Sequence, residues 1–518
     1  MTRQTRSLII LSSLVSLGGF LFGFDAAIIS GAGGLVVRDF GLSDLQFGLL
    51  VGAPSIAAIV AGLLVGPLSD LLGRRLMLII VAVLYATSAL ASALAPDYDT
   101  LVAARALGGF AFASLVLAPL YIAEIAPSDA RGRLVSINQL NIVVGFAVAY
   151  FAGYFIIQAA GVVDGPIAAL NLDETAWRWM LGIELLPAGL FFLALLIAPE
   201  SPRWLMVRGK EDKARAVVAR YHAAENIDAE IEEIRDSIES SRSKAKTPFH
   251  VFLNVGVLKL LAIGLIVAVA QQITGINAVY FYAQTIFELA GAGTNAAFAQ
   301  ATAIGIVNII FTLLAILAID FLGRKPLMII GLTGVVVSMS LAGFGFQQAR
   351  FTLDAQDVPS LSAEIDRTDL APMVGVTYES DVAFREALYD SLGEDAARIH
   401  QPELTNKAID INAGLVLAGI LGFVASFAVS LGPVMWVLLS EIFPNRIRGL
   451  AMSAITFVNA GVSSVVQVAF PLQVANLGAG FTFYTYAAFG LVFLVLVFIF
   501  LPETKQKTLE EWEAERTG

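Results

Sequence analysis

The most notable ionisable side chains inside long apolar stretches of the sequence are Asp25, Arg105 and Glu184. A charged group is costly in an apolar environment, and a charge that is kept there marks a functional site by default. A carboxyl group can take up and release a proton, and a neighbouring arginine stabilises its charged form. These residues are therefore candidates for proton binding, although Glu184 can equally serve as a structural cap for helix ends.

A second group consists of neutral side chains that can contact an uncharged ligand rich in hydroxyl groups. Each amide both donates and accepts hydrogen bonds, and an aromatic ring can cover an apolar face of a ligand. The alternative is that buried amides join neighbouring helices. Adjacent side chains on a helix point about 100° apart, so Gln271 and Gln272 share one ligand only if it lies beside the helix or the helix is broken at Gly275. The candidates are Gln139, Gln271, Gln272, Asn277, Asn308, Trp436 and Asn459.

Acidic and basic residues recur together in short loops between the apolar stretches. A carboxylate at a helix end can pair with an arginine in the following loop, and such a pair forms only when the helix ends meet. The pattern predicts a conformational latch, and the alternative is that the arginines only set the orientation in a membrane. The latch candidates are Asp70, Arg74, Arg75, Glu124, Arg131, Arg133, Asp320, Arg324, Glu441 and Arg448.

The composition requires a membrane environment for these groups. Of the 518 residues, 57% are hydrophobic and only 14% are charged, whereas a soluble surface needs roughly a quarter of the chain charged. The net charge of −11 argues against a nucleic-acid partner. The sequence has no cysteine, and its histidines are scattered, at His222, His250 and His400. We therefore expect no metal site and no other cofactor.

Hydropathy predicts an all-α membrane protein with a dozen spans, because each crossing needs about 20 apolar residues. Arginine and lysine gather in the loops after the even-numbered stretches, which predicts that both termini lie in the cytoplasm. The apolar stretches are 8–32, 45–69, 76–95, 100–122, 134–158, 178–198, 257–290, 297–318, 326–347, 410–436, 449–471 and 482–501.

The sequence repeats itself. The motif Asp70–Arg75 recurs at Asp320–Lys325, and the motif Glu124–Pro127 recurs at Glu441–Pro444. The repeats predict a six-helix half at 1–198, a cytoplasmic amphipathic linker at 199–250, and a second six-helix half at 251–518. Two halves in the same orientation imply a site between them near the middle of the membrane and alternating access by rocking.

The second half carries an extracytoplasmic insertion at about 348–408, with twelve acidic and five basic side chains. We expect a dispensable surface insertion, because the first half lacks such a segment. A functional lid is the alternative.

These residues resemble the sugar porters of the major facilitator superfamily, which include proton symporters and passive facilitators. The resemblance covers nearly the whole chain outside the insertion. Each motif alone is common, but their order and register are specific. The motifs are Asp70 to Arg75, Glu124 to Arg133, Pro199 to Trp204, Gln271 to Asn277, Gly432 to Trp436 and Pro502 to Lys505.

The resemblance implies the major facilitator fold with twelve transmembrane helices, and a proton-coupled symporter that imports a hexose or a pentose. Asp25 and Arg105 match the proton-coupling pair of the symporters, Glu184 matches a further carboxylate, and the amides and Trp436 match sugar-binding positions. Phe281 and Ala460 depart from the Tyr and Trp of many relatives, which leaves the sugar undetermined.

Two alternatives are a passive sugar uniporter and a transporter-like sensor. The chain has no phosphate-binding loop of an ATP-driven pump and no catalytic constellation, so we expect no enzyme. The expected partners are a monosaccharide, a proton and the lipid bilayer, with no obligatory protein partner, and the expected location is the cell membrane, as a bacterial inner-membrane protein.

Overall fold

The computed structural model describes residues 3–127, 130–162, 171–221, 227–243, 254–361, 365, 367–443 and 447–503. Within these residues, twelve helical segments are long and apolar enough to cross a membrane. They confirm the predicted all-α membrane fold and its number of spans. The first half contains α1 (Arg3–Val15), α2 (Leu17–Phe40), α3 (Asp44–Leu72), α4 (Arg74–Ala93), α5 (Tyr98–Ala111), α6 (Ser114–Ile125), α7 (Arg131–Ala160), α8 (Leu172–Gly182) and α9 (Leu185–Ile197).

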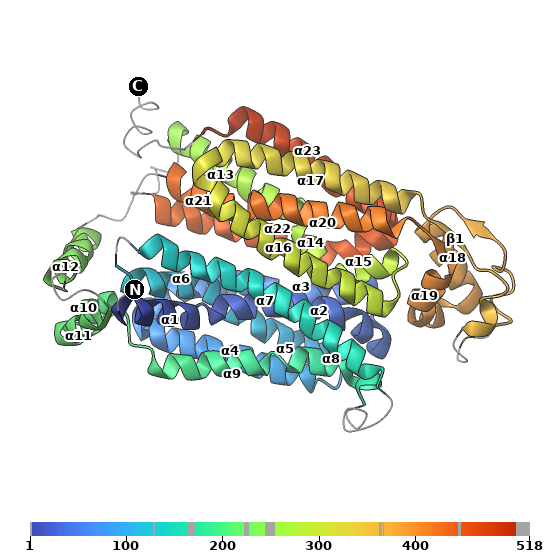
Figure 1. Ribbon diagram of the computed structural model, residues 1–518, viewed down its shortest axis with the longest axis horizontal. Helices are drawn as coiled ribbons and strands as arrows, with labels where there is room; N and C mark the ends of the chain where they lie inside the picture. Colours follow the sequence, from blue (N-terminus) through green and yellow to red (C-terminus); the bar gives the residue numbers. More distant parts are fainter. Residues whose placement is uncertain are drawn as a thin grey trace. The chain divides into compact units, whose positions relative to one another are not determined.

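Three helices follow before the second half begins, and the second half is interrupted by the insertion (Figure 1). The linker helices are α10 (Pro202–Val207), α11 (Glu211–Tyr221) and α12 (Ile227–Ser243). The second half contains α13 (Val255–Ile273), α14 (Ile276–Phe281), α15 (Ala283–Leu289), α16 (Thr294–Leu322), α17 (Arg324–Gln347), α20 (Ala413–Val429), α21 (Leu431–Ile442), α22 (Arg448–Leu477) and α23 (Ala479–Phe500).

Several spans are built from two helices rather than one. The seventh span breaks between α13 and α14, where Gly275 adopts φ 93°, a left-handed conformation that glycine takes without steric cost. The sixth span breaks between α8 and α9 at Glu184, and the tenth breaks at Ser430, three residues before Pro433. Broken helices inside membrane proteins expose backbone groups where they line a site, so these breaks point to functional positions.

The contacts divide the chain into two compact units. Unit 1 contains Met1–Ala26, Ala53–Ala149 and Leu181–Asn254, and unit 2 contains Ala27–Gly52, Tyr150–Met180 and Val255–Gly518. The division therefore passes through α2, α3, α7 and α8, so parts of these first-half helices pack with the second half. The domain boundaries inferred from the repeat follow the sequence instead, and they remain a prediction.

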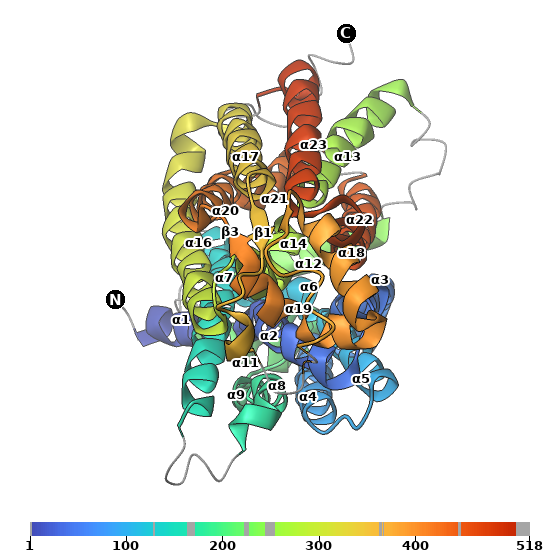
Figure 2. The same cartoon turned by 90° about the vertical axis from the view of Figure 1, so that its right-hand side faces the viewer.

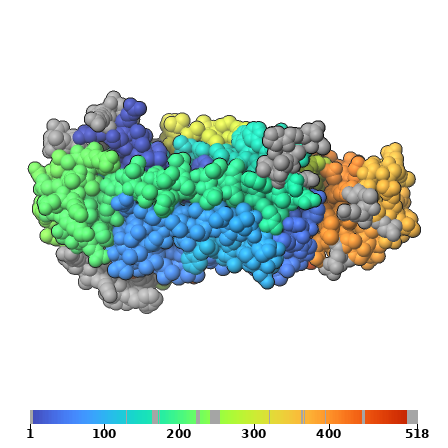
Figure 3. Space-filling view, turned by 90° about the horizontal axis from the view of Figure 1, so that it is seen from below, coloured from blue at the N-terminus to red at the C-terminus, as the bar shows by residue number. Residues whose placement is uncertain are grey.

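In unit 1, the surface formed by α4 and α9 is apolar. The space-filling view shows these two helices lying side by side (Figure 3). The side chains of Leu186 and Ile197 are 71% and 74% exposed, and Leu76 and Leu90 are 44% and 49% exposed. Such a large contiguous apolar surface is rare on a soluble monomer and suits the hydrocarbon of a bilayer.

The linker helices of unit 1 have a small core of their own. Leu205 from α10, Ala214 and Val218 from α11, and Ile231 from α12 are buried against one another. Ala214, Val218 and Tyr221 are buried on one side of α11, so this helix is amphipathic.

The insertion in unit 2 is a folded element rather than an irregular loop. It contains β1 (Arg350–Thr352), the 3₁₀ helix η4 (Val358–Ser360), β2 (Thr377–Tyr378), α18 (Asp381–Leu392), α19 (Glu394–Ala408) and β3 (Ile409–Asp410). The antiparallel sheet has the order β2-β1-β3, so Phe351 pairs with Tyr378 on one side and with Ile409 on the other. Figure 2 looks onto this end of unit 2, with α18 and α19 beside the strands.

A hydrophobic core holds the insertion together. Phe351 stacks on Phe384 with ring centroids 5.4 Å apart, and Leu353, Leu370 and Leu388 are fully buried. Burial of such side chains is worth about 1.5–3 kcal/mol each. The insertion thus has the core of a small domain.

Candidate functional site

Asp25, Arg105 and Glu184 come together in unit 1. Arg105 Nη1 on α5 donates a hydrogen bond to Asp25 Oδ1 on α2, and the two side chains are 2% and 4% exposed. Glu184, at the break between α8 and α9, is 3% exposed and interacts electrostatically with both of them. Three groups separated by many residues in sequence therefore form one buried cluster.

The cluster leaves several polar atoms available for a further partner. Within the described residues, Asp25 Oδ2, Arg105 Nε and Nη2, and Glu184 Oε1 are buried without a hydrogen-bond partner. Glu184 makes no side-chain hydrogen bond that caps α9. With both acids ionised, two carboxylates face one guanidinium, so a single bound proton makes the cluster neutral.

A hydroxyl pair lies next to the cluster and was not expected from the sequence. Tyr85 Oη on α4 lies 3.2 Å from Ser114 Oγ on α6, and Ser114 Oγ donates to the Gly18 carbonyl of α2 at 2.9 Å. These contacts join three helices around Asp25. Single hydroxyl-bearing residues in apolar helices are too common to be recognised as a site from sequence alone.

Four predicted amides form a hydrogen-bonded cluster in unit 2. Gln272 Nε2 donates to Gln271 Oε1 at 3.1 Å and to Asn459 Oδ1 at 3.2 Å. Asn459 Nδ2 donates to Gln271 Oε1 at 3.0 Å, and Asn277 Nδ2 donates to Gln272 Oε1 at 2.7 Å. The break at Gly275, one of the two predicted arrangements, allows residues on both sides of it to join this cluster.

Two further polar residues on α22 extend the amide cluster. Ser463 Oγ accepts hydrogen bonds from Asn277 Nδ2 at 2.6 Å and from Gln467 Nε2 at 2.9 Å. Asn459, Ser463 and Gln467 are spaced by four residues, so they share one face of the helix. That spacing was available in the sequence and would have identified the two additional residues.

The remaining predicted ligand-binding residues contribute no hydrogen bond to this network among the described residues. Asn308 on α16 is 4% exposed and accepts a hydrogen bond from Thr312 at 3.4 Å. Trp436 on α21 is 40% exposed, and Gln139 lies half-buried on α7 in unit 1. Their predicted roles are not tested by these contacts.

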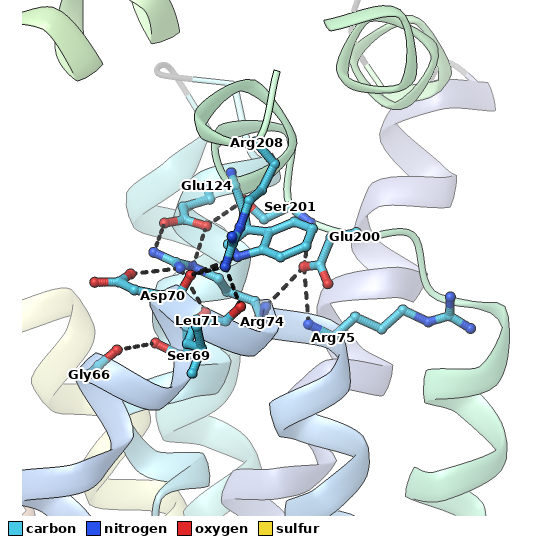
Figure 4. Close-up of polar contacts among 11 residues, drawn as sticks. Gly66, Ser69, Asp70, Leu71, Arg74, Arg75, Glu124, Glu200, Ser201 and Arg208 are labelled. Carbon is cyan, nitrogen blue, oxygen red and sulfur yellow. Dashed lines mark hydrogen bonds and ion pairs between the residues drawn. The ribbon is translucent and has the colours of Figure 1, made fainter. Parts of the chain in front are cut away.

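The Arg74 cluster of unit 1 joins three parts of the chain (Figure 4). Arg74 Nε and Nη2 each donate to Glu124 at 3.0 Å, and Arg74 Nη1 donates to Asp70 at 2.8 Å. Glu200 Oε1 accepts from the backbone N–H groups of Arg74 and Arg75 at 3.0 and 3.1 Å. Glu200 therefore completes a cluster whose other members were predicted.

Unit 2 repeats this arrangement. Arg324 Nη2 and Nε donate to Glu441 at 2.7 and 3.1 Å. Glu503 accepts from the backbone N–H groups of Arg324 and Lys325 at 3.1 and 3.0 Å. The sequence repeat is thus a repeat of contacts, and the motifs Pro199–Glu200 and Pro502–Glu503 contribute the acids that the set of candidates omitted.

Three other latch candidates make no contact with these clusters among the described residues. Arg448 Nε donates to the Phe443 carbonyl at 3.1 Å, and its Nη2 is buried without a partner among the described residues. Arg131 Nε is also buried without a hydrogen-bond partner among the described residues, whereas Arg133 is exposed. The side chain of Asp320 lies outside the described residues.

Unit 2 contains a third set of contacts, which join first-half helices to second-half helices. Ser30 Oγ on α2 hydrogen-bonds to Gln284 Oε1 on α15, and Tyr150 Oη on α7 donates to the Tyr280 carbonyl at 2.7 Å. A Cβ atom on Gly48 of α3 would lie 2.3 Å from the Val468 carbonyl of α22, so these two helices touch through backbone. First-half and second-half helices are therefore closed against each other here.

Comparison with known proteins agrees with this geometry. The family described as "Sugar (and other) transporter" matches residues 11–361 and 401–515. The arabinose-proton symporter of Bacillus subtilis (strain 168) is 32% identical over 507 residues, 98% of this chain and 94% of that protein. The D-xylose-proton symporter of Escherichia coli (strain K12) is 33% identical over 548 residues, 99% of this chain and 96% of that protein.

A solved structure of the xylose transporter from Escherichia coli in an inward open conformation superposes with a TM-score of 0.74 at 30% identity, covering 98% of this chain and 99% of that chain. The match extends over both halves and both sets of repeated contacts. The chain therefore belongs to the sugar transporter family, as a sugar porter of the major facilitator superfamily.

Proposed function

We propose that this multi-pass membrane protein is a proton-coupled monosaccharide symporter that works by alternating access. The observation that carries the proposal is the buried Asp25–Arg105 ion pair, because a passive sugar carrier has no need of a titratable pair inside the membrane. Matches to an arabinose-proton symporter and a D-xylose-proton symporter support the same function.

Proton binding acts on the charge of the cluster. The ionised cluster of Asp25, Glu184 and Arg105 carries one net negative charge, and one proton removes it. Moving an uncompensated charge through the membrane is costly, so the loaded, neutral carrier changes state more readily than the charged one. Separation of Asp25 from Arg105 in the other state would favour protonation, since the carboxylate would then lose its positive partner.

The amide cluster of Gln271, Gln272, Asn277 and Asn459 is proposed to bind the sugar. These side chains now hydrogen-bond one another, and each can exchange a partner for a sugar hydroxyl without leaving an amide unpaired. The substrate class is a pentose or a hexose. Gln139, Asn308 and Trp436 remain predictions from the sequence.

The closed contacts at Ser30–Gln284 and Gly48–Val468 are proposed to lie on the outer side of the membrane. The Arg74 and Arg324 clusters then face the cytoplasm, together with both termini, in a bacterial inner membrane. The matched inward open structure supports the assignment of this state.

Coupling to proton entry supplies enough free energy to accumulate the sugar inside the cell. A membrane potential of about 100 mV is worth about 2.3 kcal/mol per charge moved, which concentrates a neutral sugar roughly fifty-fold with one proton. A uniporter cannot concentrate its substrate at all.

Uptake of labelled pentoses and hexoses into proteoliposomes, with and without an imposed pH gradient, tests the proposal. Wild type should accumulate one of these sugars only with the gradient. Asp25→Asn should lose accumulation but retain exchange down the sugar gradient, and Asp99→Asn, which neutralises an exposed carboxylate on α5, should behave as wild type. Accumulation by Asp25→Asn, or no response of wild type to the gradient, would show that coupling is assigned wrongly.

A further inference from the structure

The insertion is fixed to the outer ends of second-half helices by three polar contacts. Asp381 Oδ2 accepts from the Ala479 N–H of α23 at 2.8 Å, and Arg385 on α18 donates to the Ala475 carbonyl of α22. Asn406 Nδ2 on α19 donates to the Gly291 carbonyl after α15 at 3.1 Å. Both helices of the insertion therefore carry an anchor to the second half.

The same insertion also contacts the turn that joins α2 to α3 in the first half. Arg398 Nη1 on α19 donates to the Gly41 carbonyl at 3.4 Å. The guanidinium groups of Arg385 and Arg398 both attract the Asp44 carboxylate at the start of α3. Gly41 adopts φ 62°, so the turn that offers this carbonyl has a conformation that favours glycine.

The contacted turn belongs to a part of the chain that must move. Residues 27–52 pack with the second half through Ser30–Gln284 and Gly48–Val468, and outward opening requires these contacts to separate. The insertion is fixed to the second half and reaches across to this moving segment. Opening therefore breaks the Arg398 contacts while the anchors at Ala475, Ala479 and Gly291 persist.

We propose that the insertion is an external lock that stabilises the outward-closed state, with Arg398 and Asp44 as its positioning residues. The proposal rests on the proposed alternating-access function. It differs from the expectation of a dispensable surface insertion, because a dispensable segment would not need to bridge two parts that separate. The family match omits residues 362–400, which include Arg398.

The lock predicts a defined change in transport kinetics. Sugar outside binds only carriers whose outer side is open, so the apparent affinity falls with the fraction of open carriers. Loss of the lock should therefore lower KM for uptake. It should also slow the return to the outward-closed state, so kcat should fall or stay constant rather than rise.

The absence of cysteine makes a direct test straightforward, because two spin labels can be placed without removing native thiols. Leu45→Cys on α3 and Leu477→Cys on α22 place labels at side chains that are 48% and 49% exposed. Distances between the labels, measured by pulsed electron resonance in nanodiscs, report the separation of the two outer helix ends.

In this doubly labelled protein, Arg398→Gln and Asp44→Asn should each raise the ratio of long to short distances between the labels by about threefold. A change of this size is expected when one partly exposed charged contact is lost. Arg398→Lys keeps the charge and should restore part of the short-distance population. Raising the salt concentration should shift the wild type in the same direction as Arg398→Gln, since exposed charges are screened.

The matched control is Arg350→Gln, which removes an arginine that pairs with Glu379 inside the insertion at 3.2 Å. It should leave the distances unchanged. Unchanged distances in both Arg398→Gln and Asp44→Asn, or an equal shift in Arg350→Gln, would overturn the lock. If these distances fail to shift while wild type still accumulates sugar with a proton gradient, the lock is wrong and the symport function stands.

Discussion

Arg74 binds both carboxylate oxygens of Glu124, through hydrogen bonds of 3.0 Å from Nε and Nη2. The two side chains are only 9% and 8% exposed. The equivalent pair in the second half, Arg324 and Glu441, has the same two-bond geometry but is 12% and 29% exposed. The two halves thus contain equivalent ion pairs that differ in their exposure to solvent.

This difference predicts unequal coupling energies. Breaking a buried ion pair leaves an unpaired buried charge and costs about 3–5 kcal/mol, whereas a more exposed pair is weaker. A double-mutant cycle with Arg74→Gln and Glu124→Gln should therefore give a larger coupling than one with Arg324→Gln and Glu441→Gln. Thermal unfolding in detergent measures both cycles, and equal couplings would contradict the burial argument.

Gln272→Ala should weaken sugar uptake because Gln272 contacts Gln271, Asn277 and Asn459 at the centre of the amide cluster. An unmade hydrogen bond in a dry site costs about 1–3 kcal/mol, so KM should rise about tenfold or more. Gln348→Ala, at an exposed position, is the control. An unchanged KM in both Gln271→Ala and Gln272→Ala would remove the amides from the sugar site.

Gly275→Ala should be destabilising for two independent reasons. The residue has φ 93°, which costs a residue with a Cβ atom about 1–2 kcal/mol, and the added Cβ would lie 2.8 Å from the Tyr486 ring. Gly189→Ala in α9 meets no heavy atom within 4 Å and should be neutral or stabilising by about 0.5–1 kcal/mol. Thermal unfolding of the two variants in one detergent compares them directly. A stable Gly275→Ala would show that α13 and α14 need no glycine between them.

Glu184→Gln should separate a coupling role from a structural one. Removal of this negative charge leaves Asp25 facing Arg105 alone, so the ionised cluster is already neutral without a bound proton. Accumulation driven by the proton gradient should then fall, while exchange down the sugar gradient remains. A lower protein yield with unchanged accumulation per carrier would assign Glu184 to structure only.

The sequence was sufficient for the membrane fold and for naming many of the residues that the structure brings together in the candidate site. Hydropathy located all twelve spans, because a bilayer demands long apolar segments whatever their tertiary contacts. The repeat of Asp70–Arg75 at Asp320–Lys325 identified arginines that occupy equivalent contacts in the structure. Amides within apolar helices were recognisable because their side chains are unusual there.

Other features depended on tertiary contacts that have no local pattern. Nothing in the sequence near Ser30 indicates that it meets Gln284, which is 254 residues away. The role of Glu200 is to accept backbone N–H groups at the start of α4, and backbone donors carry no residue signature. The insertion appeared to be an acidic surface segment, since its core residues are spread between many polar ones.

The strands β1 and β3 pair at the base of the insertion, with Phe351 opposite Ile409. The chain therefore leaves the membrane helices and returns to them at neighbouring positions. A segment with adjacent ends can be gained, lost or exchanged in evolution without changing the spacing of the helices that flank it. The same base offers an attachment point for engineering, where another small domain with close termini could replace residues 353–408 and would remove the Arg398 contact together with them.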